Sequence, residues 1–202
     1  MQPVATRLIL VRHGQSTWNL EGRLQGQRLD VPLTDQGLAE ARAAATRVST
    51  LVTSATPVIS SDQLRAQQTA EAISRALCVT PRNTELLREQ GLGSLEGRLT
   101  AELSPEPVPP GLDISEVAWG GGESIQQVHA RCRRLLGWLA EEYPAAPALV
   151  LVSHGDTLRV LLSVLEGRGH REVDWCAIGN GEVILREWSP GSVPAHARGG
   201  AR

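Results

Sequence analysis

Two short apolar runs, each followed by a histidine and a glycine, limit the fold of this 202-residue chain more than any other feature. They are residues 8–11, before Arg12-His13-Gly14, and residues 149–152, before Ser153-His154-Gly155. A continuous apolar run of this length that ends at a glycine is typical of a strand buried on both faces. Since ligands of open α/β sheets bind beyond the carboxyl ends of the strands, we expect His13 and His154 to meet around one anionic group.

Helical patterns alternate with strand patterns along the chain, which predicts an α/β fold with a largely parallel sheet. Strands are expected at 7–12, 58–59, 149–152, 177–178 and 182–186. Helices are expected after an N-cap at Thr34, after Ser61 or Asp62, from a Ser124/Gln127 capping box onward, and at 157–165. The inner face of the second helix is expected to carry Leu64, Ala72, Ile73 and Leu77. The pattern over 82–96 is irregular and predicts no element.

A proline-rich excursion interrupts this alternation at 98–123. Its four closely spaced prolines resist regular structure. A loop of this length in a compact domain is often a lid or a binding loop, and a tolerated insertion is the alternative. We expect residues 1–188 to form one domain that includes this cap, and residues 189–202 to form a disordered tail of mostly Gly, Pro, Ala and Arg.

Composition excludes several kinds of protein. The formal net charge of −2 gives no support for nucleic-acid binding. No run approaches the length of a membrane span and no signal peptide is recognisable, so we expect a cytoplasmic protein without a membrane partner. Cys78, Cys132 and Cys176 lie far apart, without metal-type spacing, and are expected to be free buried thiols. The sequence leaves the oligomeric state open, a homodimer included.

Arg12, His13 and Gly14 together suit the binding of a phosphate at the end of the first strand. Glycine lets backbone approach a ligand closely, a neutral imidazole can act as a nucleophile, and a guanidinium holds phosphoryl oxygens in a fork. The alternative for one histidine is a structural or surface role. Zinc would need three or four His, Cys or carboxylate ligands, and Arg12 beside His13 argues against a cation there. We therefore expect neither a metal nor another cofactor.

Six motifs in chain order resemble those of the histidine phosphatase superfamily, which includes the cofactor-dependent phosphoglycerate mutases and many phosphomonoesterases. Residues 12–19, R-H-G-Q-S-T-W-N, resemble the R-H-G-x-[S/T]-x-x-N signature. The other matches are L-Q-G at 24–26 with Asp30, P-L-T at 32–34 and Gly37; S-D-Q-L-R-A-Q-Q-T-A at 61–70; L-L-R-E at 86–89 with Gly93 and L-E-G at 95–97; G-G-E-S at 121–124; and V-S-H-G at 152–155. The resemblance covers residues 7 to about 188 and is closest to the phosphatase branch.

This resemblance implies a three-layer α/β/α sandwich with a mostly parallel central sheet, phosphoglycerate mutase-like, and a role for each matched residue. His13 would be the nucleophile that becomes phosphohistidine. Glu89 would protonate the leaving alkoxide and then take a proton from the attacking water. The residues around the phosphoryl group would be Arg12, Arg65 and His154, with further hydrogen bonds from Ser16, Asn19, Gln25 and the backbone N–H of Gly155. Such cations suit a transition state that spreads negative charge over three equatorial oxygens.

Two of these assignments have plainer alternatives. Without the resemblance, nothing selects Glu89 over Glu85 or Glu96, because glutamates on loops are usually solvated. Arg65 could lie on a helix surface and pair with Asp62. Its place in the first turn after the second strand favours the pocket instead.

Two activities share such a site, because a mutase returns the phosphoryl group to the substrate and a phosphatase transfers it to water. Family mutases carry a longer, basic insert after the acid/base segment, whereas residues 98–123 contain five acidic residues and only Arg98 as a base. Such a cap should repel a small, multiply charged acid. We therefore expect an enzyme of the histidine acid phosphatase type that hydrolyses a small phosphomonoester with a neutral or mildly apolar alcohol.

Two alternatives to this phosphatase remain. Residues 154–159, H-G-D-T-L-R, with L-E-G at 165–167, resemble the mutase pattern and favour a cofactor-dependent phosphoglycerate mutase. Some members of such families act as non-catalytic phosphate-binding modules, although every expected catalytic residue is present here.

Overall fold

The computed structural model describes residues 5–189, and a five-stranded sheet lies at its centre. The strands are β1 (Thr6–Arg12), β2 (Val58–Ser61), β3 (Arg82–Thr84), β4 (Ala148–Ser153) and β5 (Val183–Trp188), in the order β3-β2-β4-β1-β5. Neighbouring strands are parallel except for β5, which is antiparallel to β1. The predicted mostly parallel sheet is therefore confirmed.

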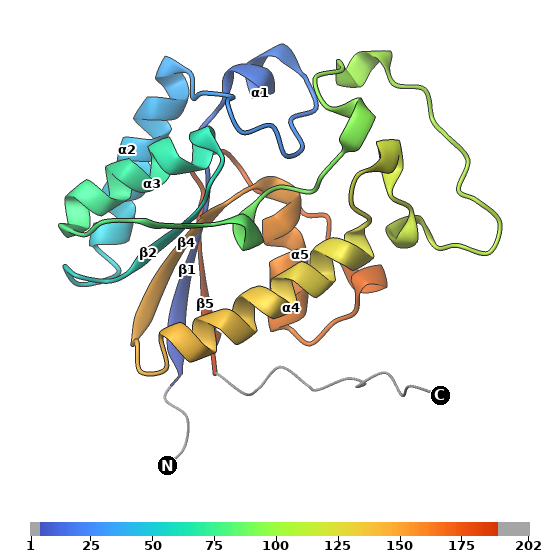
Figure 1. Cartoon of the computed structure of the whole chain (residues 1–202). Coiled ribbons are helices and arrows are strands. Elements are labelled where there is room, and N and C mark those ends of the chain that lie inside the picture. The colour runs from blue at the N-terminus through green and yellow to red at the C-terminus, as the bar shows by residue number, and fades with distance from the viewer. Residues whose placement is uncertain (1–4, 190–202) are drawn as a thin grey trace.

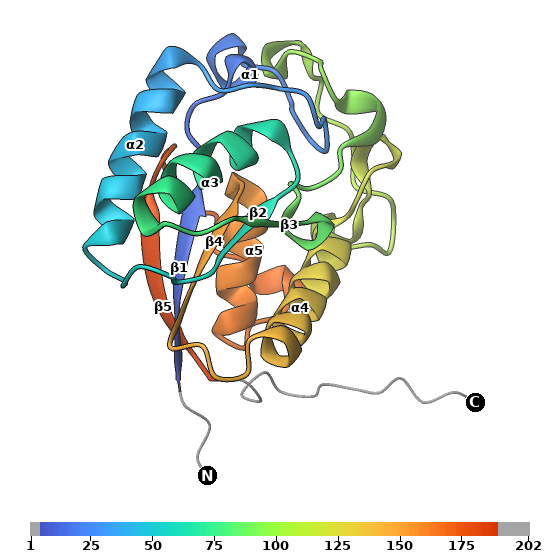
Figure 2. The same ribbon diagram turned by 60° about the vertical axis from the view of Figure 1, so that its left-hand side comes forward.

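Helices cover both faces of this sheet (Figure 1). One face packs against α2 (Asp35–Ser49) and α3 (Leu64–Leu77), and the other against α4 (Ile125–Glu142) and α5 (Gly155–Leu165). Figure 2 shows the sheet between these two helix pairs. The short α1 (Thr17–Glu21) follows β1 directly. This arrangement confirms the three-layer α/β/α sandwich.

Alternate residues of the central strands supply the two halves of the core. Leu8, Leu10, Leu149 and Leu151 pack on the α4 and α5 side. Ile9, Val11, Val150 and Val152 pack on the α2 and α3 side. All eight side chains are fully buried. Because both faces of these strands are covered, their sequences are continuously apolar rather than alternating.

Two of the predicted helix starts are confirmed and a third is wrong. The Thr34 side chain caps α2, and Ser124 and Gln127 form the capping box of α4. The cap predicted at Ser61 or Asp62 is wrong, because α3 begins at Leu64 after Gln63, whose side chain makes no cap hydrogen bond. The inner face also differs from the prediction: Ala66, Ala70, Ile73 and Leu77 are buried, whereas Leu64 and Ala72 are only partly so.

Other corrections concern short or exposed segments. The stretch expected to be irregular contains β3, whose three residues are too short and too exposed to give a periodic signal. No strand forms at 177–178, where the Ile178 carbonyl accepts a hydrogen bond from Arg12 Nη1. α5 begins at Gly155, two residues before its predicted start. Of the thiols expected to be buried, Cys132 is, but Cys78 and Cys176 are exposed.

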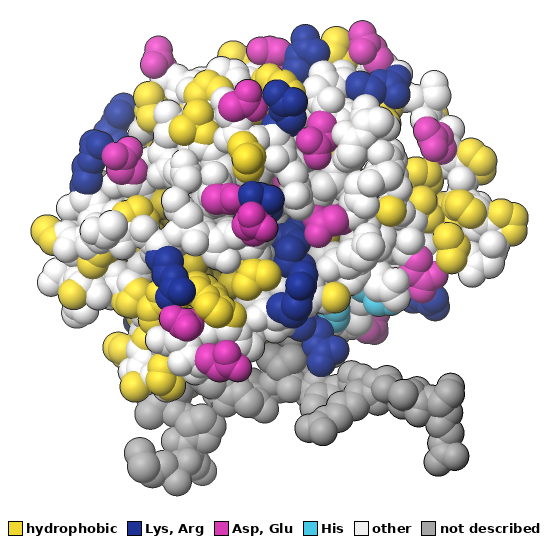
Figure 3. Space-filling view, viewed as in Figure 1, with side chains coloured by type: hydrophobic (Ala, Val, Ile, Leu, Met, Phe, Trp, Pro, Cys, Tyr) yellow, Lys and Arg dark blue, Asp and Glu magenta, His cyan; other side chains and the backbone are white. Residues whose placement is uncertain are grey.

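The excursion at 98–123 is attached at both ends and irregular between them. Leu99 pairs with Arg23 in an isolated bridge, and Glu116 forms an ion pair of 2.6 Å with Arg171. Its short 3-10 turns are η3 (Thr100–Glu102), η4 (Ile114–Glu116) and η5 (Trp119–Gly121). Apolar side chains gather on the loop between η3 and η4 (Figure 3), where Leu112 is 48% exposed. The tail predicted at 189–202 lies outside the described residues, apart from Ser189. Within 5–189, no helix has the length and apolar character needed to cross a membrane.

Candidate active site

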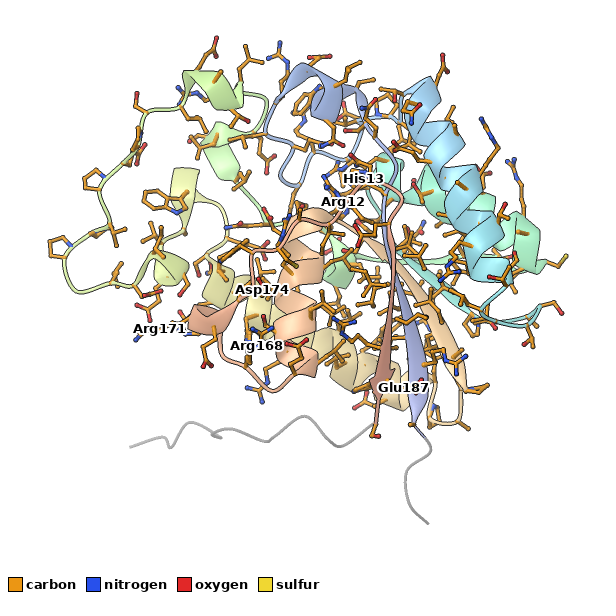
Figure 4. The ribbon with its side chains drawn as sticks, turned by 180° about the vertical axis from the view of Figure 1, so that it is seen from behind. Arg12, His13, Arg168, Arg171, Asp174 and Glu187 are labelled. Atoms are coloured by element: carbon orange, nitrogen blue, oxygen red, sulfur yellow. The ribbon has the colours of Figure 1, made fainter. Side chains whose placement is uncertain are left out.

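The two histidines meet at the carboxyl ends of β1 and β4. The parallel register pairs Arg12 with Ser153, so the next residue of each strand lies at the same edge of the sheet. The His13 and His154 ring centroids are 5.0 Å apart, with the ring planes at 60°. Both side chains are buried, His154 completely. The predicted meeting of His13 and His154 is therefore confirmed (Figure 4 labels Arg12 and His13).

Both imidazoles are neutral at pH 7. Burial, followed by the positive charge of Arg65, lowers the pKa of His13 well below its ordinary value. The same two causes lower the pKa of His154. His13 Nδ1 lies 2.7 Å from the Gly14 carbonyl oxygen. Because a carbonyl can only accept, Nδ1 carries the proton, and the Nε2 of His13 keeps a free lone pair.

Arg65 brings a buried guanidinium group to these rings, and Arg12 brings a partly buried one. Arg65 is fully buried and donates to the carbonyls of Arg28 (2.9 Å) and Gly26 (3.0 Å). Burial lowers the pKa of Arg65 to about 10, so it remains charged at neutral pH. The predicted alternative, an Arg65–Asp62 pair, is wrong, because Asp62 binds Arg88.

Four buried nitrogens in this group have no hydrogen-bond partner within residues 5–189. They are Arg12 Nε, Arg65 Nε and both ring nitrogens of His154. Buried polar atoms are normally paired, so unpaired nitrogens on the neighbouring side chains of His154, Arg12 and Arg65 indicate a place for an acceptor-rich ligand. We refer to His13, His154, Arg12 and Arg65 as the two-histidine pocket.

Gly155 and Gly14 are needed for close packing beside this pocket. A Cβ on Gly155 would lie 3.2 Å from Arg159 Nη1 and 3.7 Å from Arg12 Cζ, so the first residue of α5 fits between two arginines. A Cβ on Gly14 would lie 2.2 Å from the Gly37 carbonyl oxygen. The sequence suggested that Gly14 makes room for a ligand. In the structure it makes room for the first turn of α2.

Ser16, Asn19 and Gln25 form one polar cluster around the loop that follows His13. Ser16 caps α1, and Gln25 Oε1 accepts a hydrogen bond of 2.7 Å from its hydroxyl. Asn19 Oδ1 accepts from the Ser16 backbone N–H at 3.0 Å. The amide NH₂ groups of Asn19 and Gln25 are left without hydrogen bonds to described residues. Asn180, which sequence analysis read only as a turn residue, joins this cluster by donating to the His13 carbonyl at 3.2 Å.

Glu89 lies at the start of α5, next to the two arginines. Its Oε1 accepts from the backbone N–H groups of Gln90 and Thr157, each at 3.0 Å, and its Oε2 from the Asp156 N–H at 3.3 Å. Its negative charge raises the pKa of Arg12 and Arg65 against the effect of burial. A helix N-terminus favours such a carboxylate.

The two glutamates that compete with Glu89 have other environments. Glu85 is 76% exposed at its side chain and pairs with Arg88. Glu96 Oε1 accepts from the N–H groups of Gln27 and Leu92 and so joins two loops.

A buried ion pair that the sequence analysis missed holds the Glu89 loop. Arg131 of α4 donates to both carboxylate oxygens of Glu123, at 3.0 and 2.9 Å, and also to the Glu89 carbonyl at 3.2 Å. Gln63 Oε1 accepts from the Glu89 N–H at 2.8 Å. The available signal was the helical spacing, because Arg131 lies three residues after the buried Val128 and beside Cys132. A charged residue on the apolar face of a helix requires a buried partner.

An apolar cleft of about 750 Å³ opens beside the two-histidine pocket. Its lining residues are Leu24, Leu92, Leu95, Arg98, Thr100, Leu103, Ser104, Pro105, Glu106, Ile114, Trp119 and Asp156. Most of them belong to residues 92–119, and Asp156 links the cleft to the loop that holds Glu89. Among residues 5–189, no group of three or more His, Cys, Asp or Glu side chains is arranged to hold a metal ion.

Comparison with known proteins identifies the family. The chain matches the model of the histidine phosphatase superfamily (branch 1) over residues 8–197. It belongs to this superfamily, as its motifs predicted, and is thus either a phosphatase or a mutase. It is 38% identical over 165 residues to a probable phosphoglycerate mutase GpmB of Yersinia pestis, covering 80% of this chain and 75% of that relative.

Solved structures of two phosphatases resemble this one. A mycobacterial glucosyl-3-phosphoglycerate phosphatase, in complex with VO3, is 29% identical with a TM-score of 0.78 and 90% coverage of both chains. A phosphoserine phosphatase mutant of Entamoeba histolytica, in complex with phosphoserine, is 25% identical with a TM-score of 0.73 and 89% coverage of both chains. The fold is therefore shared with enzymes that act on different phosphomonoesters.

Proposed function

We propose that this protein is a metal-independent phosphomonoesterase that forms a phosphohistidine on Nε2 of His13. The observation that carries the proposal is the set of unpaired buried nitrogens on the side chains that neighbour the His13 ring. A bound phosphoryl group would accept hydrogen bonds from Arg12, Arg65 and His154. Preorganised cationic donors of this kind stabilise the charge on the equatorial oxygens in the transition state. The amides of Asn19 and Gln25 and the Gly155 N–H would complete the shell, with Ser16 orienting Gln25.

The reaction would proceed in two steps. His13 Nε2 forms a bond to phosphorus as the ester P–O bond breaks, and protonated Glu89 gives its proton to the leaving alkoxide. Water then attacks phosphorus, the N–P bond breaks, and Glu89 takes a proton from the water. Glu89 Oε2 is the better placed oxygen for this transfer, because Oε1 accepts from two N–H groups and from the Thr157 hydroxyl.

The apolar cleft supports hydrolysis over phosphoryl return. Arg98 is the only basic residue that lines it, whereas Glu106 and Asp156 are acidic. A small polyanionic acid would find little to bind there, whereas a neutral or apolar alcohol would be accommodated. The second candidate is a phosphoglycerate mutase, favoured by the relative named as a probable mutase and by the pattern at 154–159.

The test is phosphate release from an aryl phosphate, with EDTA present, by the wild type, His13→Ala and the control His129→Ala. His129 is a half-buried histidine of α4 that binds the Arg168 carbonyl, away from the pocket. We expect release by the wild type and the control, and a loss of about a thousandfold or more in His13→Ala.

Three other outcomes would decide against parts of this proposal. Equal release by His13→Ala would remove His13 as the nucleophile. Loss of release in the presence of EDTA would remove metal independence. Isomerisation of 3-phosphoglycerate with its bisphosphate primer, without phosphate release, would establish the mutase instead.

A further inference from the structure

Asp156 occupies the junction between the two-histidine pocket and the apolar cleft. It lies in the first turn of α5, its backbone N–H bonds Glu89 Oε2, and its side chain lines the cleft. In the proposed function Glu89 protonates the leaving oxygen. The part of the substrate directly attached to that oxygen therefore passes close to Asp156.

Only one of the two carboxylate oxygens of Asp156 is hydrogen-bonded to a described residue. Its Oδ1 accepts from Arg159 Nη1 at 2.7 Å, and its Oδ2 makes no hydrogen bond to another described residue. The Arg159 side chain is 17% exposed and its Nε is occupied by the Cys176 carbonyl, whereas the Asp156 side chain is 38% exposed. The acid rather than its partner therefore faces the cleft.

Most of the remaining cleft wall carries no charge. Arg98 and Glu106 are the other charged residues of the lining, and both belong to the excursion rather than to α5. The cation next to Asp156 is Arg159, whose side chain is only 17% exposed and already donates to Asp156 and to the Cys176 carbonyl. A negative group next to the ester would be repelled at short range in a partly desolvated site, whereas a hydroxyl or ammonium could donate to Oδ2.

We infer that Asp156 determines the substrate class: it selects monophosphates that carry a hydroxyl or ammonium group on the carbons next to the ester, and rejects those with a carboxylate or second phosphate there. This inference rests on the proposed function and deepens it. The apolar walls then accommodate the bulk of the alcohol farther from phosphorus.

The experiment uses two substrates that differ in one group. Glycerol 3-phosphate and 3-phosphoglycerate have the same three-carbon length, with a hydroxymethyl in one and a carboxylate in the other. The ratio of their kcat/KM values is measured for the wild type, Asp156→Asn and the control Glu102→Gln, a change at an exposed acid of the excursion that does not line the cleft. Asparagine keeps the shape of the side chain and an acceptor for Arg159, so the fold is preserved.

We expect the wild type to prefer glycerol 3-phosphate and Asp156→Asn to reduce that preference about tenfold, mainly by gaining activity on 3-phosphoglycerate. Glu102→Gln should leave the ratio within about twofold, since this charge is exposed to solvent and lies outside the cleft lining. Failure of Asp156→Asn to gain on 3-phosphoglycerate relative to glycerol 3-phosphate overturns the inference.

A second measurement needs only the wild type and Asp156→Asn. Burial and the nearby Glu89 raise the pKa of Asp156 to about 6, against the opposing charges of Arg159 and Arg12. The wild-type preference should therefore weaken as the pH falls through about 6, and the ratio for Asp156→Asn should stay flat. The ratio for Asp156→Asn also controls for ionisation of the two phosphates, because the same pair of substrates is used.

A flat wild-type ratio also contradicts the role of Asp156. Failure of the proposed function looks different, because a mutase would interconvert phosphoglycerates and release no phosphate from any ester. If the enzyme releases phosphate from an aryl ester but Asp156→Asn does not change the kcat/KM ratio, the proposed phosphatase function still stands. Only the inference about Asp156 is then removed.

Discussion

The two-histidine pocket and the apolar cleft are neighbours built in opposite ways. The pocket is made from strand ends and first helical turns. Its side chains are buried or, for Arg12, partly buried, and those of Arg12, His13 and Arg65 are bonded to backbone carbonyls. The cleft is lined largely by residues 92–119, where short 3-10 turns alternate with irregular chain and apolar side chains such as Ile114 are exposed. In the proposed function, strand register therefore determines where the phosphoryl group is held, and a loop determines the space left for the alcohol. Loops can change without disturbing the sheet, so substrate choice can vary while the reaction stays the same.

The largest effect should come from removing a cation from the pocket. Arg65→Met keeps most of the buried side-chain volume but removes the positive charge and the N–H donors of the guanidinium group. We expect kcat/KM to fall about a thousandfold, and by the same factor for large and small esters, because Arg65 does not line the cleft. Arg75→Met, at a position of the same helix whose side chain is 77% exposed, is the matched control and should be near wild type. Thermal unfolding checks that both variants fold. A loss confined to bulky esters would contradict the separation of the two regions.

The next effect concerns stability against pH. Both pocket histidines are neutral when folded, with pKa values lowered well below the ordinary value. Below pH 6.5 the unfolded chain therefore binds more protons than the folded one, so stability falls as the pH falls. Each histidine contributes a loss of about 1.4 kcal/mol at pH 5.5.

Asp156 acts in the opposite sense. Its pKa is raised to about 6, so the folded state binds its proton first and gains stability as the pH falls through that value. Protonation of Asp156 adds less than about 1 kcal/mol to the free energy of unfolding at pH 5.5. Together with the two histidines, it leaves the protein about 2 kcal/mol less stable at pH 5.5 than at pH 7.5. Urea unfolding at pH 5.5 and pH 7.5 measures this difference in the free energy of unfolding. His154→Gln should remove about half of the histidine contribution, and an unchanged pH dependence in that variant would show that His154 is not buried neutral.

The smallest effect should arise in the cleft. Trp119→Ala removes an aromatic wall, so we expect KM for an aryl phosphate to rise about five- to tenfold with kcat nearly unchanged. The KM for glycerol 3-phosphate should change by less than twofold, because this substrate is too short to contact Trp119. Trp175→Ala is the control, because Trp175 is 54% exposed and does not line the cleft. A drop in kcat for both esters would mean that Trp119 supports the pocket rather than the cleft.

The features that could be predicted from sequence are those that one local pattern determines. The apolar runs before His13 and His154 identify β1 and β4, and parallel strands place their ends at one edge. Thr34 and Ser124 mark helix starts through their own side chains. The family motifs added the residues that only the folded chain brings near, such as Glu89.

Predictions failed where a distant partner decides the local structure. Asp62 does not cap α3 because Arg88, distant in sequence, binds its carboxylate. β3 forms because β2 offers it an edge, not because its own three residues favour a strand. Arg131 and Glu123 lie eight positions apart, and only packing shows that they enclose the Glu89 loop. Long-range pairing of this kind leaves no periodic trace in one sequence.

The strand order also has a consequence for how the protein is made. β4 lies between β1 and β2, yet it is synthesised long after both. During translation neither β1 nor β2 can form its hydrogen bonds to β4 until residues 148–153 have left the ribosome. Pairings so distant along the chain are slow to form and leave strand edges open. Nascent chains that stop before β4 should therefore lack the proposed phosphatase activity and should depend on chaperones, because the second histidine and the central strand are supplied together.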